Sequence, residues 1–267
     1  MIKLVLSDVD GTLVPFGEEH ASARTLAAIH RLRKGGIRFG LATGRDEMEL
    51  LRQFEGHSEP FETGILSNGK KIKVDGEVVR LTLLDNDGLN RMAKLIAEYP
   101  ETFVTAYPLE ATPENDIYCV GATEEEIAPW AEKFSFRPMV VDEFPDVEVL
   151  GATIACPHEE SMMLEIIERG KELCPEFDFV RPSAKWTDIV PKGVNKGTAL
   201  EWLVERLDIT KDEVAMFGDA DNDLAILSAL ENAVVVQNAT PAAKAAASVE
   251  IGPVEEDAVA QILERMV

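Results

Sequence analysis

A largely apolar run near the start of the chain, Ile2-Lys3-Leu4-Val5-Leu6, is followed after Ser7 by Asp8-Val9-Asp10-Gly11-Thr12. The apolar run predicts a buried strand, and side chains two positions apart on a strand point to the same side. Asp8 and Asp10 therefore direct two carboxylates at one place, where like charges repel unless a cation or a shared proton lies between them. Gly11 lets the backbone turn and a ligand approach closely. The pattern predicts a ligand site at the end of a buried strand.

A second apolar segment, Met216-Phe217-Gly218, also ends in a carboxylate, that of Asp219, and Asp223 follows about one helical turn later. Ligands of open α/β sheets bind beyond the carboxyl ends of the strands, so we expect Asp219 and Asp223 to face Asp8 and Asp10. Four convergent carboxylates without a nearby His or Cys suit a hard cation, for which Mg²⁺ is the best candidate.

The order of apolar and polar segments predicts an α/β fold with two domains. Residues 1–82 and 191–267 alternate short buried strands with helices, which is typical of a parallel, Rossmann-like sheet. Expected strands there cover about 2–6, 37–42, 63–67, 214–217 and 233–236, with a hairpin of 70–74 and 78–82 around Asp75-Gly76. Expected helices cover about 22–34, 46–54, 196–207, 221–230 and 255–266.

Residues 83–190 differ in composition and contain several prolines and acidic turns. This segment predicts an α+β domain inserted into the first domain. Its expected helices cover about 87–98, 124–134 and 159–172, and its expected strands about 102–107, 117–120, 148–155 and 177–181.

Charge and cysteine content narrow the partners and the compartment. The chain of 267 residues has 49 acidic against 26 basic residues and a formal charge of −23, which disfavours nucleic acid and anionic membranes. No apolar stretch approaches the length of a membrane span, and no signal peptide is expected before the first strand. Cys119, Cys156 and Cys174 form no C-x-x-C pair, which predicts reduced thiols in the cytoplasm.

Two further motifs are suited to an anion. Thr43-Gly44 follows a predicted strand and precedes a helix, so it offers a hydroxyl and backbone N–H groups. Lys196 is expected at the start of a helix, where the helix dipole disfavours a cation unless a carboxylate or a bound anion compensates it.

Together these residues predict attack of a carboxylate on a phosphoryl group. At ~4 Å and an effective dielectric constant of ~20, a carboxylate and a phosphate dianion repel by roughly 8 kcal/mol, which a divalent cation and Lys196 would reverse. Asp8 would attack phosphorus and form an aspartyl-phosphate. Asp10 would protonate the leaving alkoxide and then deprotonate the hydrolytic water.

At these residues the chain resembles the haloacid dehalogenase superfamily, whose four motifs occur in order as Asp8-Val9-Asp10-Gly11-Thr12, Thr43, Lys196 and Gly218-Asp219 through Asp223. The resemblance implies Asp8 as the nucleophile and Asp10 as the general acid and base. It also implies that Mg²⁺ is held by Asp8, the backbone oxygen of Asp10 and Asp219, with Asp223 in or near its shell, and that Thr43 and Lys196 bind the phosphoryl group.

The long insertion between Thr43 and Lys196 matches the type-2 cap of the Cof-like, IIB branch of this superfamily. Ala42-Thr43-Gly44-Arg45, Ser67-Asn68-Gly69 and Gly193-Val194-Asn195-Lys196-Gly197 resemble that branch as well. Gly44, Arg45, Asn68 and Asn238 are additional candidates for binding the phosphoryl group or the substrate.

We therefore expect a cytoplasmic, Mg²⁺-dependent phosphatase of small phosphorylated metabolites, with sugar phosphates favoured. A phosphoglycolate-type phosphatase and a phosphomutase are the alternatives that use the same nucleophile. A binding module with a catalytically silent site is the alternative from another class.

Overall fold

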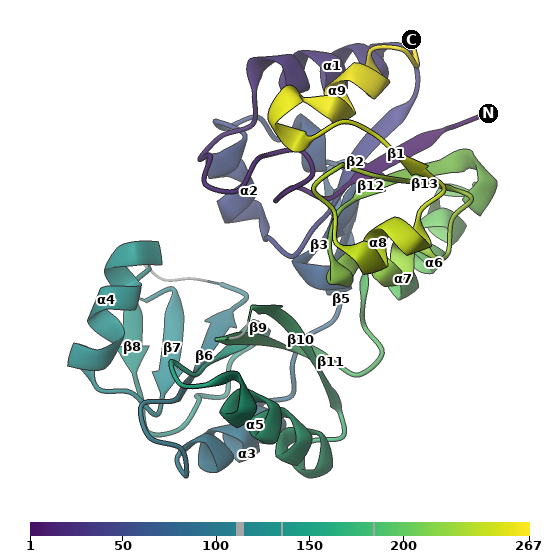
Figure 1. Ribbon diagram of the computed structural model, residues 1–267. Coiled ribbons are helices and arrows are strands. Elements are labelled where there is room, and N and C mark those ends of the chain that lie inside the picture. Colours follow the sequence, from purple (N-terminus) through teal and green to yellow (C-terminus); the bar gives the residue numbers. More distant parts are fainter. Residues whose placement is uncertain (111–114, 135, 184) are drawn as a thin grey trace. The chain divides into compact units, whose positions relative to one another are not determined.

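The computed structural model describes residues 1–110, 115–134, 136–183 and 185–267, and the chain divides into two compact units (Figure 1). The first unit comprises Met1–Leu81 and Asn195–Val267, and the second comprises Thr82–Val194. From the sequence we expected the divisions after residues 82 and 190.

The first unit is built on a mixed sheet with the strand order β14-β13-β12-β1-β2-β3-β4-β5. Strands β14 to β3 are parallel, and β4 and β5 continue the sheet as antiparallel strands. The strands are β1 Leu4–Ser7, β2 Arg38–Ala42, β3 Gly64–Leu66, β4 Lys71–Val74, β5 Glu77–Leu81, β12 Val214–Gly218, β13 Asn232–Val235 and β14 Val249–Glu250.

Helices connect and cover these strands, and α1 packs beside α9 (Figure 1). The α-helices described in this unit are α1 Ala23–Lys34, α2 Glu47–Gln53, α6 Lys196–Leu207, α7 Leu224–Leu227, α8 Pro241–Ala246 and α9 Ala258–Leu263. Single 3₁₀ turns are formed by Glu59–Phe61, Ser67–Gly69, Lys211–Glu213, Asp221–Asp223 and Val254–Glu256.

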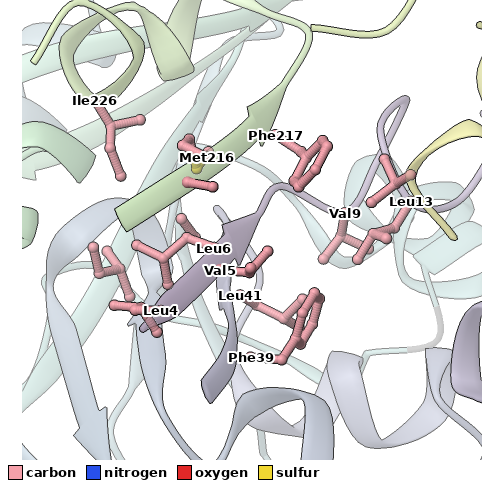
Figure 2. Packing of buried hydrophobic residues seen from close by; sticks show 14 of the residues in the cluster. Leu4, Val5, Leu6, Val9, Leu13, Phe39, Leu41, Met216, Phe217 and Ile226 are labelled. Carbon is pink, nitrogen blue, oxygen red and sulfur yellow. The ribbon is translucent and has the colours of Figure 1, made fainter. Parts of the chain in front are cut away.

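The core of the first unit is centred on β1, whose four residues are all buried. Figure 2 shows the side chains of β1 between those of its two neighbours, Phe39 and Leu41 on β2 and Met216 and Phe217 on β12. A central strand with neighbours on both edges and helices over the sheet explains why the run is apolar without alternation. This packing fixes the position of the strand end from which Asp8 follows.

The second unit has a sheet with the strand order β10-β11-β9-β6-β7-β8, antiparallel except for the pair β7 and β8. Its strands are β6 Phe103–Pro108, β7 Ile117–Val120, β8 Pro138–Val140, β9 Val149–Ala155, β10 Phe177–Ser183 and β11 Trp186–Pro191. Its helices, among the residues described, are α3 Asn86–Ile96, α4 Glu124–Phe134 and α5 Glu160–Leu173.

Alternation along β6 divides the second unit into two clusters. Val104 packs in the cluster that also holds residues of α3 and α5, whereas Phe103 packs in the cluster that holds Ile127 of α4. Successive side chains of a strand point to opposite faces, so α4 covers the face opposite to α3 and α5. Trp130 and Trp186 pack edge to face in the second cluster, with ring centroids 4.5 Å apart.

The predicted fold class, a parallel-sheet α/β core with an inserted α+β segment, is confirmed. The hairpin around Asp75-Gly76 and the helix 196–207 have their expected positions. The helix expected over 221–230 is wrong in length, because a 3₁₀ turn precedes α7 and α7 ends at Leu227. The helix expected from 255 begins at Ala258 instead, and strands β8, β11 and β14 were not predicted.

Across the described parts of the chain, the helices are too short or too polar for any of them to traverse a lipid bilayer.

Candidate active site

The first acidic motif directly follows β1, as the sequence predicts. The backbone N–H of Asp8 donates to the carbonyl of Phe217 on β12, 2.8 Å away, so the parallel pairing continues for one residue beyond the strand. This register brings Asp8 beside Gly218, the last residue of β12. Two neighbouring strands therefore deliver the first and last acidic motifs to the same edge of the sheet.

Three carboxylates meet at this edge. Asp8, Asp219 and Asp223 are all buried, and each has one carboxylate oxygen within 4.8 Å of the others. Asp223 is engaged at both oxygens: Oδ1 accepts from the Lys196 ammonium, and Oδ2 accepts from the backbone N–H groups of Asp219 and Ala220. The arrangement brings together three of the four aspartates predicted to converge.

Lys196 is the cation of this cluster and is only 1% exposed. Its Nζ lies 2.7 Å from Oδ1 of Asp223 and 3.1 Å from Oδ1 of Asp8. Lys196 is the first residue of α6, where a positive charge opposes the helix dipole. The carboxylates of Asp8 and Asp223 supply the compensating negative charge that the sequence predicts.

Burial and crowding shift the acidity of these groups. Burial raises the pKa of Asp8 to about 7; Lys196 lowers it, while Asp223 and Asp219 raise it further. Burial also raises the pKa of Asp219 to about 6, against a hydrogen bond from Thr12. For Lys196, burial lowers the pKa, but the attraction of Asp223 and Asp8 outweighs it and the pKa is raised. Three carboxylates around one ammonium leave an excess of buried negative charge.

The turn after the first motif is closely packed against the second. Gly11 has a φ of +80°, and a Cβ at this position would lie 2.6 Å from Oδ2 of Asp219 and 2.6 Å from the ring of Phe16. Only glycine fits both the conformation and the space. The hydroxyl of Thr12 donates to Oδ1 of Asp219 at 2.7 Å, which joins the two motifs directly.

Thr43 and Gly44 follow β2, the strand on the other side of β1. Thr43 is buried, and its hydroxyl accepts a hydrogen bond from the backbone N–H of Arg45. The backbone N–H of Asn68 donates to the Thr43 carbonyl, 2.9 Å away. The predicted phosphate loop is thus linked to a second turn, Ser67–Gly69.

The side chain of Asn68 lies flat against this loop. A Cβ on Gly44 would be 3.1 Å from Asn68 Oδ1 and 3.2 Å from its Nδ2. Asn68 is only 8% exposed, and none of the described residues donates a hydrogen bond to its Oδ1. A buried amide oxygen without a partner is costly. The residue also adopts a left-handed φ of +57°. Local strain of this kind is concentrated at functional sites.

Two predicted substrate-binding residues instead contact the protein itself. Arg45 donates from Nε and Nη2 to the two carboxylate oxygens of Asp10, at 2.7 and 2.8 Å. Asn238 donates to the backbone carbonyl of Gly11 at 2.7 Å and accepts from the N–H of Val254 at 3.2 Å. Both side chains therefore hold parts of the first motif.

Thr12 and Gln53 were not assigned a role from the sequence. Thr12 stands inside the first motif, so its position was a usable signal for its contact with Asp219. Gln53 is buried at the end of α2, and its amide nitrogen lies 3.4 Å from Oδ1 of Asp10. Nothing in the local sequence around Gln53 indicates this contact.

Comparison with known proteins agrees with these features. The model of the haloacid dehalogenase-like hydrolase family matches residues 5–263. The HMP-PP phosphatase of Yersinia enterocolitica is 28% identical over 258 residues, which cover 91% of this chain and 87% of the relative. The chain therefore belongs to the haloacid dehalogenase-like hydrolases. The predicted superfamily and the predicted hydrolase class are therefore confirmed.

Two solved structures share the fold over nearly the whole chain. BT1666 from Bacteroides thetaiotaomicron, a phosphatase of the same superfamily, aligns with a TM-score of 0.82 and 22% identity over 99% of this chain and 95% of its own. The subclass IIB sugar phosphatase BT4131 aligns with a TM-score of 0.78 and 20% identity over 99% and 98%.

Proposed function

We propose that this protein is a Mg²⁺-dependent phosphatase that hydrolyses small phosphorylated metabolites, sugar phosphates above all, through an aspartyl-phosphate on Asp8. The observation that carries this proposal is the buried Asp8 carboxylate, 3.1 Å from Lys196 and grouped with Asp219 and Asp223. A buried nucleophile beside one cation and two further carboxylates suits a reaction that brings an anion toward an anion.

In the first half of the reaction, an oxygen of Asp8 attacks phosphorus and the bond from phosphorus to the ester oxygen breaks. Asp10 gives a proton to the departing alkoxide, which leaves as an alcohol. In the second half, Asp10 takes a proton from a water molecule that attacks phosphorus, and the bond to Asp8 breaks. Inorganic phosphate leaves, and both aspartates return to their initial states.

The donor set of the site fits Mg²⁺. Asp8, Asp219 and Asp223 are hard oxygen donors whose three charges are opposed by one lysine. Asp8 and Asp219 would hold the ion together with the backbone oxygen of Asp10. Asp223 is already bound to Lys196 and to two backbone N–H groups, so it would stabilise the positions of these ligands. The bound ion would supply positive charge that offsets the repulsion between carboxylates and phosphoryl group.

The phosphoryl group would be bound by Lys196, the Thr43-Gly44 loop and Asn68. The support for Asn68 is its side chain packed against Gly44, where its amide nitrogen can donate to a phosphoryl oxygen. Arg45 and Asn238, which contact Asp10 and Gly11, would act on the loops of the site instead.

We also propose that the second unit, close to the predicted domain 83–190, is the cap that excludes water and selects the leaving group. The resemblance to the type-2 cap supports this role. A cytoplasmic location, without a nucleic-acid partner, stays a prediction; the three cysteines, all free and buried, are consistent with it.

The test is phosphate release from a panel of phosphorylated metabolites, with Mg²⁺ and with EDTA. We expect release from sugar phosphates in Mg²⁺ only, and none from the variant Asp8→Asn, whose folding is checked by circular dichroism. Preference for phosphoglycolate would favour that alternative, and activation by a sugar bisphosphate would indicate a mutase. No release from any compound by the wild type would overturn the proposal in favour of a silent module.

A further inference from the structure

We propose that Arg45 is a positioning residue for Asp10 and does not bind the phosphoryl group. This inference rests on the proposed function and goes beyond it. In this role, the guanidinium fixes the direction of the carboxylate that exchanges a proton with the leaving group.

The geometry between the two side chains is a two-point fork. Nε and Nη2 of Arg45 lie 2.7 and 2.8 Å from the two carboxylate oxygens of Asp10. A bidentate pair of this kind fixes the plane of the carboxylate as well as its distance. Among the residues described, Oδ2 accepts from Arg45 alone and keeps a second lone-pair site, so the carboxylate can still take part in proton transfer.

Asp10 needs such a support because its side chain is not buried. It is 34% exposed, unlike the fully packed Asp8. The remaining described contact of its carboxylate is the amide of Gln53 at 3.4 Å. Without Arg45, packing alone would leave Asp10 free to adopt other rotamers, and small misplacements of a reacting group cost much of its effect.

Arg45 is itself fixed by the first turn of α2. Its Nη1 lies 3.4 Å from Glu49, and Glu49 also accepts from the backbone N–H of Asp46. Three nitrogens of the guanidinium are thus directed at carboxylates of the protein. This leaves the face of Arg45 poorly suited to a phosphoryl group, since its charge is already balanced.

The helix start is anchored in turn by two buried lysines of β4. Lys71 pairs with Asp46 at 2.7 Å, and Lys73 pairs with Glu47 at 2.5 Å. Both lysines are less than a tenth exposed. The result is a continuous series of contacts from β4 through the start of α2 and Arg45 to Asp10.

Two classes of substrate separate positioning of Asp10 from binding of phosphate. An alkyl phosphate needs a proton on its leaving oxygen, whereas p-nitrophenyl phosphate releases a stable anion without one. The quantity to compare is kcat/KM, which covers the steps up to departure of the leaving group. The variants are Arg45→Gln, Arg45→Lys and Asp10→Asn, with Arg52→Gln on the same helix as the matched control.

We expect Arg45→Gln to lower kcat/KM for the alkyl ester by about 100-fold and to change it little for the aryl ester, as Asp10→Asn does. Arg45→Lys keeps the charge but not the fork, so we expect most of the same loss. Inhibition by inorganic phosphate should be unchanged. In the double variant, Arg45→Gln should add little to Asp10→Asn, because both remove the same function.

Equal losses for both esters together with weaker inhibition by phosphate would overturn the inference and assign Arg45 to phosphate binding. This outcome differs from failure of the proposed function, in which the wild type would hydrolyse neither ester. Arg45→Lys keeps the test valid if Arg45→Gln does not fold.

Discussion

At the residue scale, the site accepts an unfavourable charge distribution in the folded state. Asp8, Asp219 and Asp223 are buried around one lysine, and burial holds the pKa of Asp8 and of Asp219 well above the usual value. A carboxyl with a raised pKa binds its proton more tightly in the folded protein than in the unfolded chain. Its contribution therefore destabilises the fold as pH rises.

This predicts that Asp8→Asn stabilises the metal-free protein. The pKa of Asp8 rises from 3.8 to about 7, so the penalty is absent below pH 4 and complete above pH 7. We expect the free energy of unfolding of Asp8→Asn to exceed that of the wild type by at most about 4 kcal/mol, at about 1.4 kcal/mol for each pKa unit. Urea unfolding in EDTA at several pH values measures it.

Asp75→Asn is the matched control, with the opposite sign. The pKa of Asp75 is lowered, first by its hydrogen bonds from Arg38, so its contribution stabilises the fold above the unfolded pKa. Asparagine is compatible with its left-handed φ of +51°. We expect Asp75→Asn to be less stable than the wild type at neutral pH, and this difference to shrink at acid pH. A stability of Asp8→Asn equal to that of the wild type at pH 8 would contradict the account.

A second prediction concerns Thr12, whose hydroxyl donates to Asp219 at 2.7 Å. Thr12→Val keeps the shape and removes this hydrogen bond, so we expect the Mg²⁺ concentration for half-maximal activity to rise about 10- to 100-fold. Thr12→Ser retains the hydroxyl and serves as the control. An unchanged Mg²⁺ requirement in the valine variant would show that the contact does not orient Asp219.

The residues of the site differ in how far the sequence predicts them. Asp8, Asp219, Asp223 and Lys196 stand in motifs at strand ends and helix starts, so topology alone brings them together. The pairing of Arg45 with Asp10 depends on side-chain rotamers across 35 positions of sequence. No local pattern encodes such a contact.

At the element scale, the start of α6 determines where Lys196 lies. Oδ1 of Asn195 accepts hydrogen bonds from the backbone N–H groups of Gly197 and Thr198, so the helix begins at a defined residue. A well-capped start keeps the ammonium between Asp8 and Asp223.

We therefore expect Asn195→Ala to lower the free energy of unfolding by about 1 kcal/mol. It should also reduce kcat, because the helix start that carries Lys196 is less defined. Asn195→Ser, which retains a capping oxygen, should keep most of both. Chemical denaturation and steady-state kinetics measure the two effects. Loss of stability with unchanged kcat would show that the N-cap of α6 does not affect catalysis.

Each element that differs from its sequence-based prediction has its own physical reason. β8 and β14 have three and two residues, too short for an alternating pattern. β11 places the polar Thr187 at a fully buried position, so its sequence shows no regular alternation of apolar and polar residues. At the start of the helix expected from residue 221, Asp223 accepts from the backbone N–H groups of Asp219 and Ala220, and the first turn is 3₁₀.

At the scale of the whole molecule, each unit has its own sheet and its own hydrophobic core. The second unit is one continuous segment, Thr82–Val194, and includes its own buried residues on both faces of the sheet. A segment with these properties meets the requirements of an independent folding unit.

We expect the fragment 82–194 to fold on its own and to unfold cooperatively. Near-ultraviolet circular dichroism and a sigmoidal urea transition would show this, with full-length protein as reference. A fragment without a cooperative transition would mean that its stability depends on the first unit.

The central claim is that Asp8 carries the phosphoryl group. The most direct measurement is reduction of the enzyme with borohydride during turnover, since borohydride converts an aspartyl-phosphate to homoserine, followed by mass spectrometry of the first peptide. We expect homoserine at position 8 when substrate and Mg²⁺ are present, and none without substrate. Unmodified Asp8 during active turnover, or homoserine at another aspartate, would contradict the account.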